Sequence, residues 1–249
     1  MVINIMKDIQ SQRDERFINI RKVGVKDISY PITVLDKANK VQHTLAKVNM
    51  YVNLPHQFKG IHMSRFIEVL NRFHGRINFR SFHAILKEMV ERLQAEAAHM
   101  EIEFPYFLKK KRIINKPELI EYRCSMYGTL DSSDSLSLKI DVPISPPTPV
   151  QIDSGLPGSL GLWGFARTSL SFRHFIWIED IIDMVEKVTS HDLRWPVDKR
   201  AAAERYLSVE SMADSLAQKL VTHPDICKFK VTVENFARGF TTYASIQGP

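Results

Sequence analysis

The sequence predicts an α+β fold built from two similar units that follow one another along the chain. Three observations lead to this prediction. Several stretches alternate between apolar and polar residues, as half-buried strands do. Other stretches carry apolar residues at helical spacing. Each half of the chain shows the order strand, strand, helix, helix, strand, strand. We therefore expect one unit over residues 1–130, including an N-terminal arm, and a second over 131–249. The antiparallel strands should carry their helices on one face.

The first half contains strands on both sides of two helical segments. Residues 44–54, TLAKVNMYVNL, alternate in polarity and predict a half-buried strand. Two apolar helical stripes follow, separated by Gly75. The first stripe is Met63, Phe66, Ile67, Leu70 and Phe73, and the second is Phe82, Ile85, Leu86, Met89, Val90, Leu93 and Ala97. Strands are then expected near 101–108 and over 118–130, and the basic run KKKR at 109–112 is expected at a solvated turn.

The second half repeats this order. Strands are predicted over 136–144, LSLKIDVPI, and over 165–177, FARTSLSFRHFIW. Two helices follow, and Pro224 prevents the second from continuing. Their inward residues are Ile178, Ile181, Ile182, Val185 and Val188 in the first, and Val209, Met212, Ala213, Leu216, Ala217 and Leu220 in the second. The alternating segment 227–236 and the segment 241–246 are expected to be the last two strands.

The composition is that of an ordinary globular protein, with 44% hydrophobic and 25% charged residues. No apolar run approaches the roughly 20 residues of a membrane helix, so we expect no membrane partner. The two cysteines form neither a disulfide framework nor a metal spacing, so we expect a reducing, cytoplasmic location. The formal charge of +6 is compatible with anionic partners. Basic residues are not clustered with aromatic ones, so we expect no nucleic-acid partner. Cys124 and Cys227 lie in strand patterns and are expected to be packed thiols.

Four stretches resemble one enzyme family. These are RKVGVKDISYPI at 21–32, HQFKGIHMSRFIEVLN at 56–71, FIWIEDIIDMVEK at 175–187 and VTVENFARGFTTYASI at 231–246. They are similar to the type IB GTP cyclohydrolases of the tunnelling-fold superfamily, and the similarity runs from about residue 8 to the C-terminus. The resemblance implies a tandem ββααββ fold assembled into a barrel-like homotetramer. It also implies a place in folate biosynthesis, where a bound divalent metal opens the imidazole ring of GTP to release formate and make 7,8-dihydroneopterin triphosphate.

The loop between the strands at 136–144 and 165–177 departs from the family pattern. The family carries a Cys-Pro-Cys-Ser-Lys-Glu run and then Gly-Ala-His-Asn. The two cysteines correspond to Thr148 and Val150, the glutamate falls near Asp153, and the histidine corresponds to Leu160. Near the C-terminus, a metal-binding histidine of the family is replaced by Phe240. A phenyl ring cannot coordinate a metal, so we expect no metal ligands at these positions and no bound zinc, manganese or iron as cofactor.

The resemblance also indicates residues that would act in catalysis. A family glutamate after the third helix corresponds to Asp192, and another at the start of the fourth helix corresponds to Glu204. We therefore take Asp192 and Glu204 as the candidate catalytic residues. If a metal were bound through relocated ligands, the candidates for them would be Asp153, His191 and Asp192.

Four residues are candidates for binding the ligand. His62 and Arg65 lie at the entrance of the first helix, where a helix N-terminus favours an anion. Glu234 lies on the polar face of its strand, where a carboxylate can bind a purine or pterin edge through paired hydrogen bonds. Trp163, with Phe165, can form the wall of a pocket for a flat ring. Each also has a structural interpretation, as a helix cap, a polar strand residue or a core aromatic.

The replaced ligand positions make enzymatic activity uncertain and leave three functional hypotheses. The leading one is a divergent paralogue that binds a purine, pterin or related planar heterocycle in an intersubunit pocket and acts without the family metal. One alternative is an active metal-dependent GTP cyclohydrolase with relocated ligands. The other is a non-catalytic partner or regulator of a true cyclohydrolase. GTP turnover and metal content separate these hypotheses.

Overall fold

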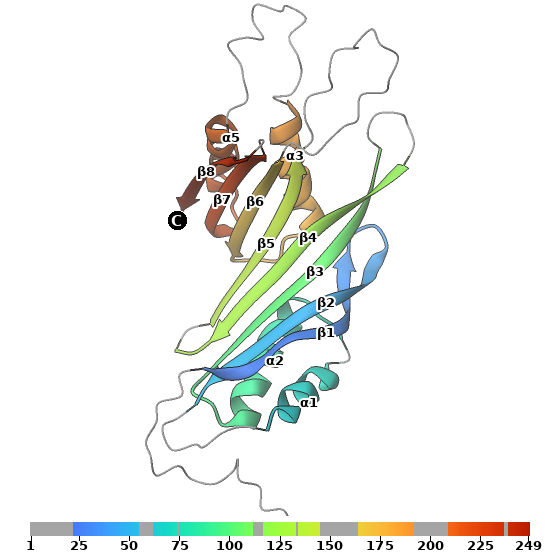
Figure 1. The fold of residues 1–249 in the computed structure, drawn as a ribbon, viewed down its shortest axis with the longest axis vertical. Coiled ribbons are helices and arrows are strands. Elements are labelled where there is room, and N and C mark those ends of the chain that lie inside the picture. Colours follow the sequence, from blue (N-terminus) through green and yellow to red (C-terminus); the bar gives the residue numbers. More distant parts are fainter. Residues whose placement is uncertain are drawn as a thin grey trace, which may run out of the picture. The chain divides into compact units, whose positions relative to one another are not determined.

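The computed structural model describes residues 22–54, 62–73, 75–111, 117–132, 134–144, 164–191, 209–236 and 239–249. The strands are β1 (Val23–Asp36), β2 (Lys40–Asn53), β3 (Ala97–Lys111), β4 (Pro117–Leu130), β5 (Asp134–Ile144), β6 (Gly164–Phe172), β7 (Ile226–Phe236) and β8 (Thr241–Gly248) (Figure 1). The helices are α1 (Ser64–Arg72), α2 (Phe79–Leu93), α3 (Ile178–His191) and α5 (Val209–Val221). The strands are neighbours in the order β1 to β8. The predicted α+β class and the doubled ββααββ order are confirmed.

The chain folds into two compact units. The first comprises the described parts of 1–105 and 125–136, and the second those of 106–124 and 137–249. The second unit therefore takes the end of β3 and the start of β4. The predicted boundary after residue 130 was based on the repeated order of elements along the chain. The two compact units do not test it, so it stays a prediction.

In the first unit, α1 and α2 pack on one face of the sheet (Figure 1). Alternate residues of β2, such as Val48 and Met50, are fully buried, as the alternating pattern predicts. Helix α1 is rotated slightly from its predicted position. Val69 is completely buried, whereas Met63 and Ile67 are 40% and 36% exposed. The apolar stripe of α1 is therefore Phe66, Val69 and Leu70.

Gly75 separates α1 from α2, as predicted, because the backbone there needs a conformation that favours glycine. Its φ is +68°, in the left-handed region. A side chain would also bring a Cβ to 2.4 Å from the carbonyl oxygen of Pro31. The close approach allows the amide of Thr33 to donate a 2.7 Å hydrogen bond to the Gly75 carbonyl, which ties the turn to β1.

Glu88 links the two helices of the first unit by accepting hydrogen bonds from Arg72 of α1 and Arg92 of α2. Burial alone would raise the pKa of Glu88, but the two arginines outweigh it and lower the pKa. Because the folded-state pKa lies below the unfolded one, this stabilisation is present above the unfolded pKa of about 4.3 and is lost as pH falls through the folded pKa.

We therefore expect Glu88→Gln to lower the free energy of unfolding by about 0.5–1 kcal/mol at pH 7. The difference from the wild type should shrink as pH falls below about 4. Urea unfolding at a series of pH values measures it. Glu91→Gln, which removes an exposed carboxylate on the same helix, serves as the control. A difference that stayed constant down to pH 2 would contradict the proposed ionic origin.

The second unit packs α3 and α5 against one face of its strands (Figure 1). Ile140 of β5 and Val231 of β7 are fully buried, together with Val185 of α3 and Leu216 of α5. The opposite face of these strands carries polar and charged side chains such as Arg167 and Glu234 together with aromatic ones such as Phe165. This unit therefore has one apolar and one largely polar sheet face.

Polar contacts join α3 to β3 within the second unit. The hydroxyl of the fully buried Tyr106 donates a 2.7 Å hydrogen bond to Glu179. Lys110 pairs with Asp183 and, at 2.9 Å, with Glu186. Burial would lower the pKa of Lys110, but these two carboxylates outweigh it and raise the pKa. The solvated turn expected at 109–112 is therefore corrected, since β3 continues to residue 111 and Lys110 is paired there.

Two strand boundaries differ from the prediction. Helix α2 ends at Leu93 and is followed by Gln94 with φ +50°, so Ala97 begins β3 instead of completing the helical stripe. Strand β6 ends at Phe172 rather than continuing to Trp177. The chain bends there, and the Arg173 amide donates a 2.9 Å hydrogen bond to the Asp225 carbonyl.

The two cysteines are free thiols within strands, in agreement with the prediction. Cys124 is completely buried, and burial, together with the charges of Asp141 and Glu179, raises its pKa far above the usual range. Such a thiol stays protonated and is not a nucleophile. Among the described residues, none of the helices has the length and apolar character needed to cross a membrane.

Candidate functional site

The polar face of the second unit carries the candidate site around Glu234. Strand pairing brings side chains from four strands into cross-strand rows. One row contains Pro143, Phe165, Glu234 and Tyr243, which are paired in that order. The next row contains Asp141, Arg167, Thr232 and Ser245. These positions alternate with the buried core residues of the same strands, so their side chains leave the sheet on the face opposite the helices.

Arg167 lies between two carboxylates. Its Nη1 donates a 2.9 Å hydrogen bond to Oε1 of Glu234. Its Nε lies 3.5 Å from Oδ2 of Asp141, which is a charge contact and not a hydrogen bond. Lys139 is a second cation, 3.8 Å from Oδ1 of Asp141. The side chain of Asp141 is only 7% exposed and that of Glu234 only 18%, so these charges interact more strongly than exposed ones would.

Aromatic side chains stand beside this charged cluster. Phe165 and Phe236 meet edge to face, with ring centroids 5.8 Å apart. The Arg167 guanidinium lies 6.0 Å from the Phe165 centroid. Phe236 is 42% exposed and Tyr243 is 69% exposed. A carboxylate with exposed aromatic neighbours can bind the polar edge of a planar ring while an aromatic side chain packs on its face.

The structure places two of the predicted ligand-binding residues in the first unit. His62 is half-buried and lies two residues before the start of α1, and its carbonyl accepts a 3.1 Å hydrogen bond from the Arg65 amide. Arg65 is exposed in the first turn of α1. Helix α1 begins at Ser64 after Met63, without a side-chain cap. The position at a helix entrance is as predicted, and an anion-binding role stays a prediction.

The remaining candidates lie outside what the structure describes. Asp153, Trp163, Asp192 and Glu204 fall in the ranges 145–163 and 192–208. His191 is the last residue of α3, and its side chain is not among those described. Only Glu234 of the six site residues is therefore placed within the charged cluster.

Arg167 and Asp141 were not predicted from the sequence as site residues. Arg167 lies two residues after Phe165 and so shares its strand face. This alternation was a usable signal, but pairing with Glu234 depends on the register between β6 and β7.

A metal site requires several ligand side chains close together. Within the described ranges, no three histidine, cysteine, aspartate or glutamate side chains are grouped so that they could hold a metal ion.

Comparison with known proteins identifies the family. A family model described as type I GTP cyclohydrolase FolE2 matches residues 6–151. The GTP cyclohydrolase FolE2 of Syntrophobacter fumaroxidans is 43% identical, over 97% of this chain and 99% of the relative. The chain belongs to the type I GTP cyclohydrolase FolE2 family. The FolE2 proteins of Syntrophotalea carbinolica and Geobacter sulfurreducens are each 40% identical, over 98% and 97% of this chain and 96% and 98% of their own.

Solved structures show the same fold at much lower identity. Uricase from Arthrobacter globiformis has a TM-score of 0.57 at 10% identity, covering 91% of this chain and 92% of the uricase. A uricase from Bacillus fastidious has a TM-score of 0.58 at 8% identity, with the same coverage. At such low identity the likeness concerns the fold alone. It supports the tunnelling type of fold expected from the sequence.

The leading functional hypothesis is wrong. Relatives that are 38–43% identical along nearly the whole chain are named GTP cyclohydrolase FolE2. This similarity contradicts the hypothesis of a paralogue that acts without the family's chemistry. The hypothesis relied on a few positions in the loop at 145–163 and near the C-terminus. Family membership relies on agreement throughout the chain, which a few replaced positions do not outweigh. The comparisons favour the alternative of an active GTP cyclohydrolase.

Proposed function

We propose that this protein is an active GTP cyclohydrolase of the FolE2 family, which opens the imidazole ring of GTP, releases formate and forms 7,8-dihydroneopterin triphosphate. The observation that carries the proposal is the 38–43% identity, across almost the full chain, to proteins named GTP cyclohydrolase FolE2. The pathway would be folate biosynthesis, in the cytoplasm, and the substrate would be a planar purine. A homotetramer with an intersubunit pocket belongs to the same proposal.

Glu234 is the described residue best suited to hold the guanine base. Guanine presents two neighbouring donors, N1–H and the 2-amino group, which match the two oxygens of one carboxylate. Arg167 holds Oε1 of Glu234 at 2.9 Å and thereby orients the carboxylate. Phe165 and Phe236, in edge-to-face contact beside it, provide apolar surface for the ring. Binding at one edge would leave the imidazole side of the purine free for attack by water.

Ring opening also requires an activated water and groups that move protons. In the family a divalent metal supplies this activation. The described residues contain no group of side chains that fits such a metal, so we derive no step through it. The acid–base roles proposed for Asp192 and Glu204 concern residues outside the described ranges.

GTP turnover by the purified full-length protein tests the proposal. We expect formate and 7,8-dihydroneopterin triphosphate to appear in a 1:1 ratio, measured by a formate dehydrogenase assay and by the fluorescence of the oxidised pterin. ATP serves as the matched control, because it lacks the donor pair that Glu234 would bind. No pterin from GTP, under conditions in which a FolE2 relative is active, would refute the proposal. Such a result would favour the non-catalytic partner hypothesis.

Chelation in the same assay tests the prediction that no metal is bound. If that prediction holds, protein treated with EDTA keeps its turnover and contains no stoichiometric zinc, manganese or iron. Loss of turnover that is restored by Zn²⁺ or Mn²⁺, with one ion per chain, would contradict it. That outcome would favour relocated ligands, for which Asp153, His191 and Asp192 are the candidates.

A further inference from the structure

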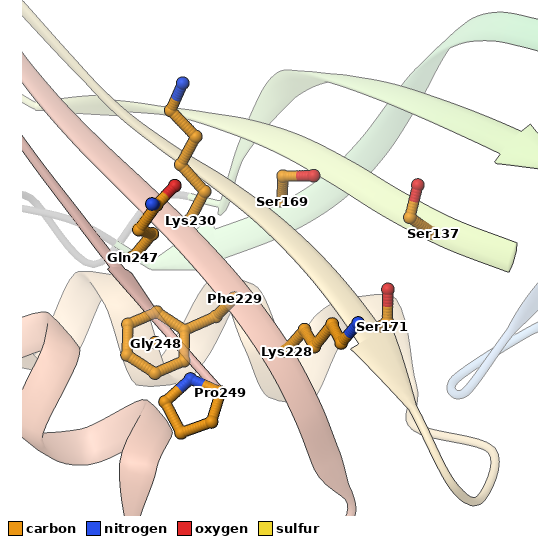
Figure 2. Close-up of a pocket in the computed structure, with 9 residues that line it drawn as sticks. All are labelled: Ser137, Ser169, Ser171, Lys228, Phe229, Lys230, Gln247, Gly248 and Pro249. Atoms are coloured by element: carbon orange, nitrogen blue, oxygen red, sulfur yellow. The ribbon is translucent and has the colours of Figure 1, made fainter. Parts of the chain in front are cut away.

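A second polar region lies on the same sheet face as Glu234, farther along the strands. A groove of about 590 Å³ opens there. Its polar lining is Ser137, Ser169, Ser171, Lys228, Lys230 and Gln247. Figure 2 shows these side chains on β5, β6, β7 and β8, with Lys228 extending beside Ser171. Phe229, Gly248 and Pro249 complete the lining on the apolar side.

Strand register assembles this groove from residues far apart in sequence. Ser169 of β6 lies opposite Lys230 of β7, which lies opposite Gln247 of β8. Ser171 lies opposite Lys228 in the neighbouring row. Lys139 of β5 lies opposite Ser169 and adds a third cation beside the groove. The hydroxyl groups therefore stand next to ammonium groups across the strands.

The bonding capacity of this lining is unused within the described part of the chain. None of its six polar side chains has a hydrogen bond or ion pair with another described residue. The row that contains Arg167 differs. There Arg167 faces Asp141, and the Thr232 hydroxyl is hydrogen-bonded to that of Ser245. Asp141 in that row is already paired with Lys139 and Arg167. The side chains that line the groove include two lysines and no carboxylate.

We propose that this groove binds a phosphate chain. Ammonium and hydroxyl groups are the side chains that bind phosphate oxygens through charge-assisted hydrogen bonds. Lys228 and Lys230 are two residues apart on one strand face, so their Cα atoms are separated by about 7 Å. Two or more linked phosphates would therefore contact both lysines better than a single phosphate would.

The phosphate chain could belong to a nucleotide or to a free polyphosphate. Lys230 lies four residues before Glu234 on the same strand and face, a distance of about 13 Å. A nucleotide with its base at Glu234 could extend along β7 toward the groove. Only this assignment of the source depends on the proposed function, whereas binding of the phosphate chain does not.

Calorimetric titration of the full-length protein with inorganic triphosphate tests the proposal. We expect measurable binding, weakened at least tenfold in the double variant Lys228→Gln/Lys230→Gln, because two charge-assisted contacts are lost. The control is Lys187→Gln/Lys219→Gln, which removes two exposed lysines from α3 and α5 on the other face of the sheet. It should bind like the wild type. Absence of binding to the wild type, or equal affinities in the two double variants, would overturn the proposal.

GTP kinetics with the same variants identify the source of the phosphates. A KM for GTP raised about tenfold in Lys228→Gln/Lys230→Gln, with kcat unchanged, would assign the groove to the triphosphate of the substrate. An unchanged KM, together with lost triphosphate binding, would assign it to a free polyphosphate. If the protein has no GTP turnover, the proposed function fails while the triphosphate titration still decides whether the groove binds phosphate.

Discussion

Replacing Glu234 with glutamine is expected to lower kcat/KM for GTP about 100-fold. The amide keeps the size of the side chain but offers one acceptor in place of two, and its NH₂ group would face a donor of the guanine. One charge-assisted hydrogen bond is lost, and one donor of the guanine is left unpaired. Together these changes correspond to a loss of roughly 3 kcal/mol in transition-state stabilisation. Arg167 would also lose one of its two carboxylate partners, the one 2.9 Å away. Initial rates of formate release over a range of GTP concentrations measure the effect.

Two controls make the Glu234 result specific. Asp214→Asn removes a carboxylate from the exposed surface of α5 in the same unit and should leave kcat/KM unchanged. Urea unfolding of Glu234→Gln should still show one cooperative transition, with a midpoint lowered by the loss of the ion pair with Arg167. A folded Glu234→Gln enzyme with kcat/KM within twofold of the wild type would refute the proposed base-binding role.

The largest effect on stability is expected from Phe82→Ala, which should lower the free energy of unfolding by about 3–5 kcal/mol. Phe82 is fully buried in α2. Its ring lies against Gly128 of β4, where an added Cβ would be 2.3 Å from the ring atom Cε1. Glycine is therefore required at 128 by close packing. Since folded domains are stable by only about 5–15 kcal/mol, this loss would remove a large part of the total.

Gly128→Ala should cost about 1–3 kcal/mol by overpacking the same contact. In the double variant Phe82→Ala/Gly128→Ala the new methyl group enters the space left by the ring. The double variant should therefore lose less free energy of unfolding than the two single variants lose together. This coupling identifies the contact between the two residues. Urea unfolding curves measure all three values. Val221→Ala, at a position that is 63% exposed, is the control and should change stability by no more than about 0.5 kcal/mol. Additive single and double effects would contradict the packing between α2 and β4.

The fold could largely be predicted from the sequence because its signals are local. Alternation along residues 44–54 corresponds to β2 and its buried face, and helical spacing in residues 209–221 corresponds to the core-facing side of α5. The errors occurred where elements end. The apparent strand over 165–177 stops at Phe172 because the chain is tied to Asp225, more than 50 residues away. Such a contact leaves no periodic signal.

The candidate site was predicted only in part. Glu234 could be assigned to the polar face of its strand from alternation alone, and the structure places it there. Its partner Arg167 and the neighbouring Asp141 could not be assigned, because they come from strands joined to β7 through register. The loop at 145–163 led to a different error. A few replaced residues there suggested that the family's activity was lost, and the family relationship contradicts this.

The sequence by itself determined the order of the elements, the buried side of most strands and helices, and the family. These depend on the local periods of backbone structure and on similarity spread along the whole chain. Only the tertiary structure decided which polar side chains share a site. Arg167 meets Glu234, and Lys230 stands between Ser169 and Gln247, because the strands pair in one register. A shift by one residue would move every one of these side chains to the opposite face of the sheet.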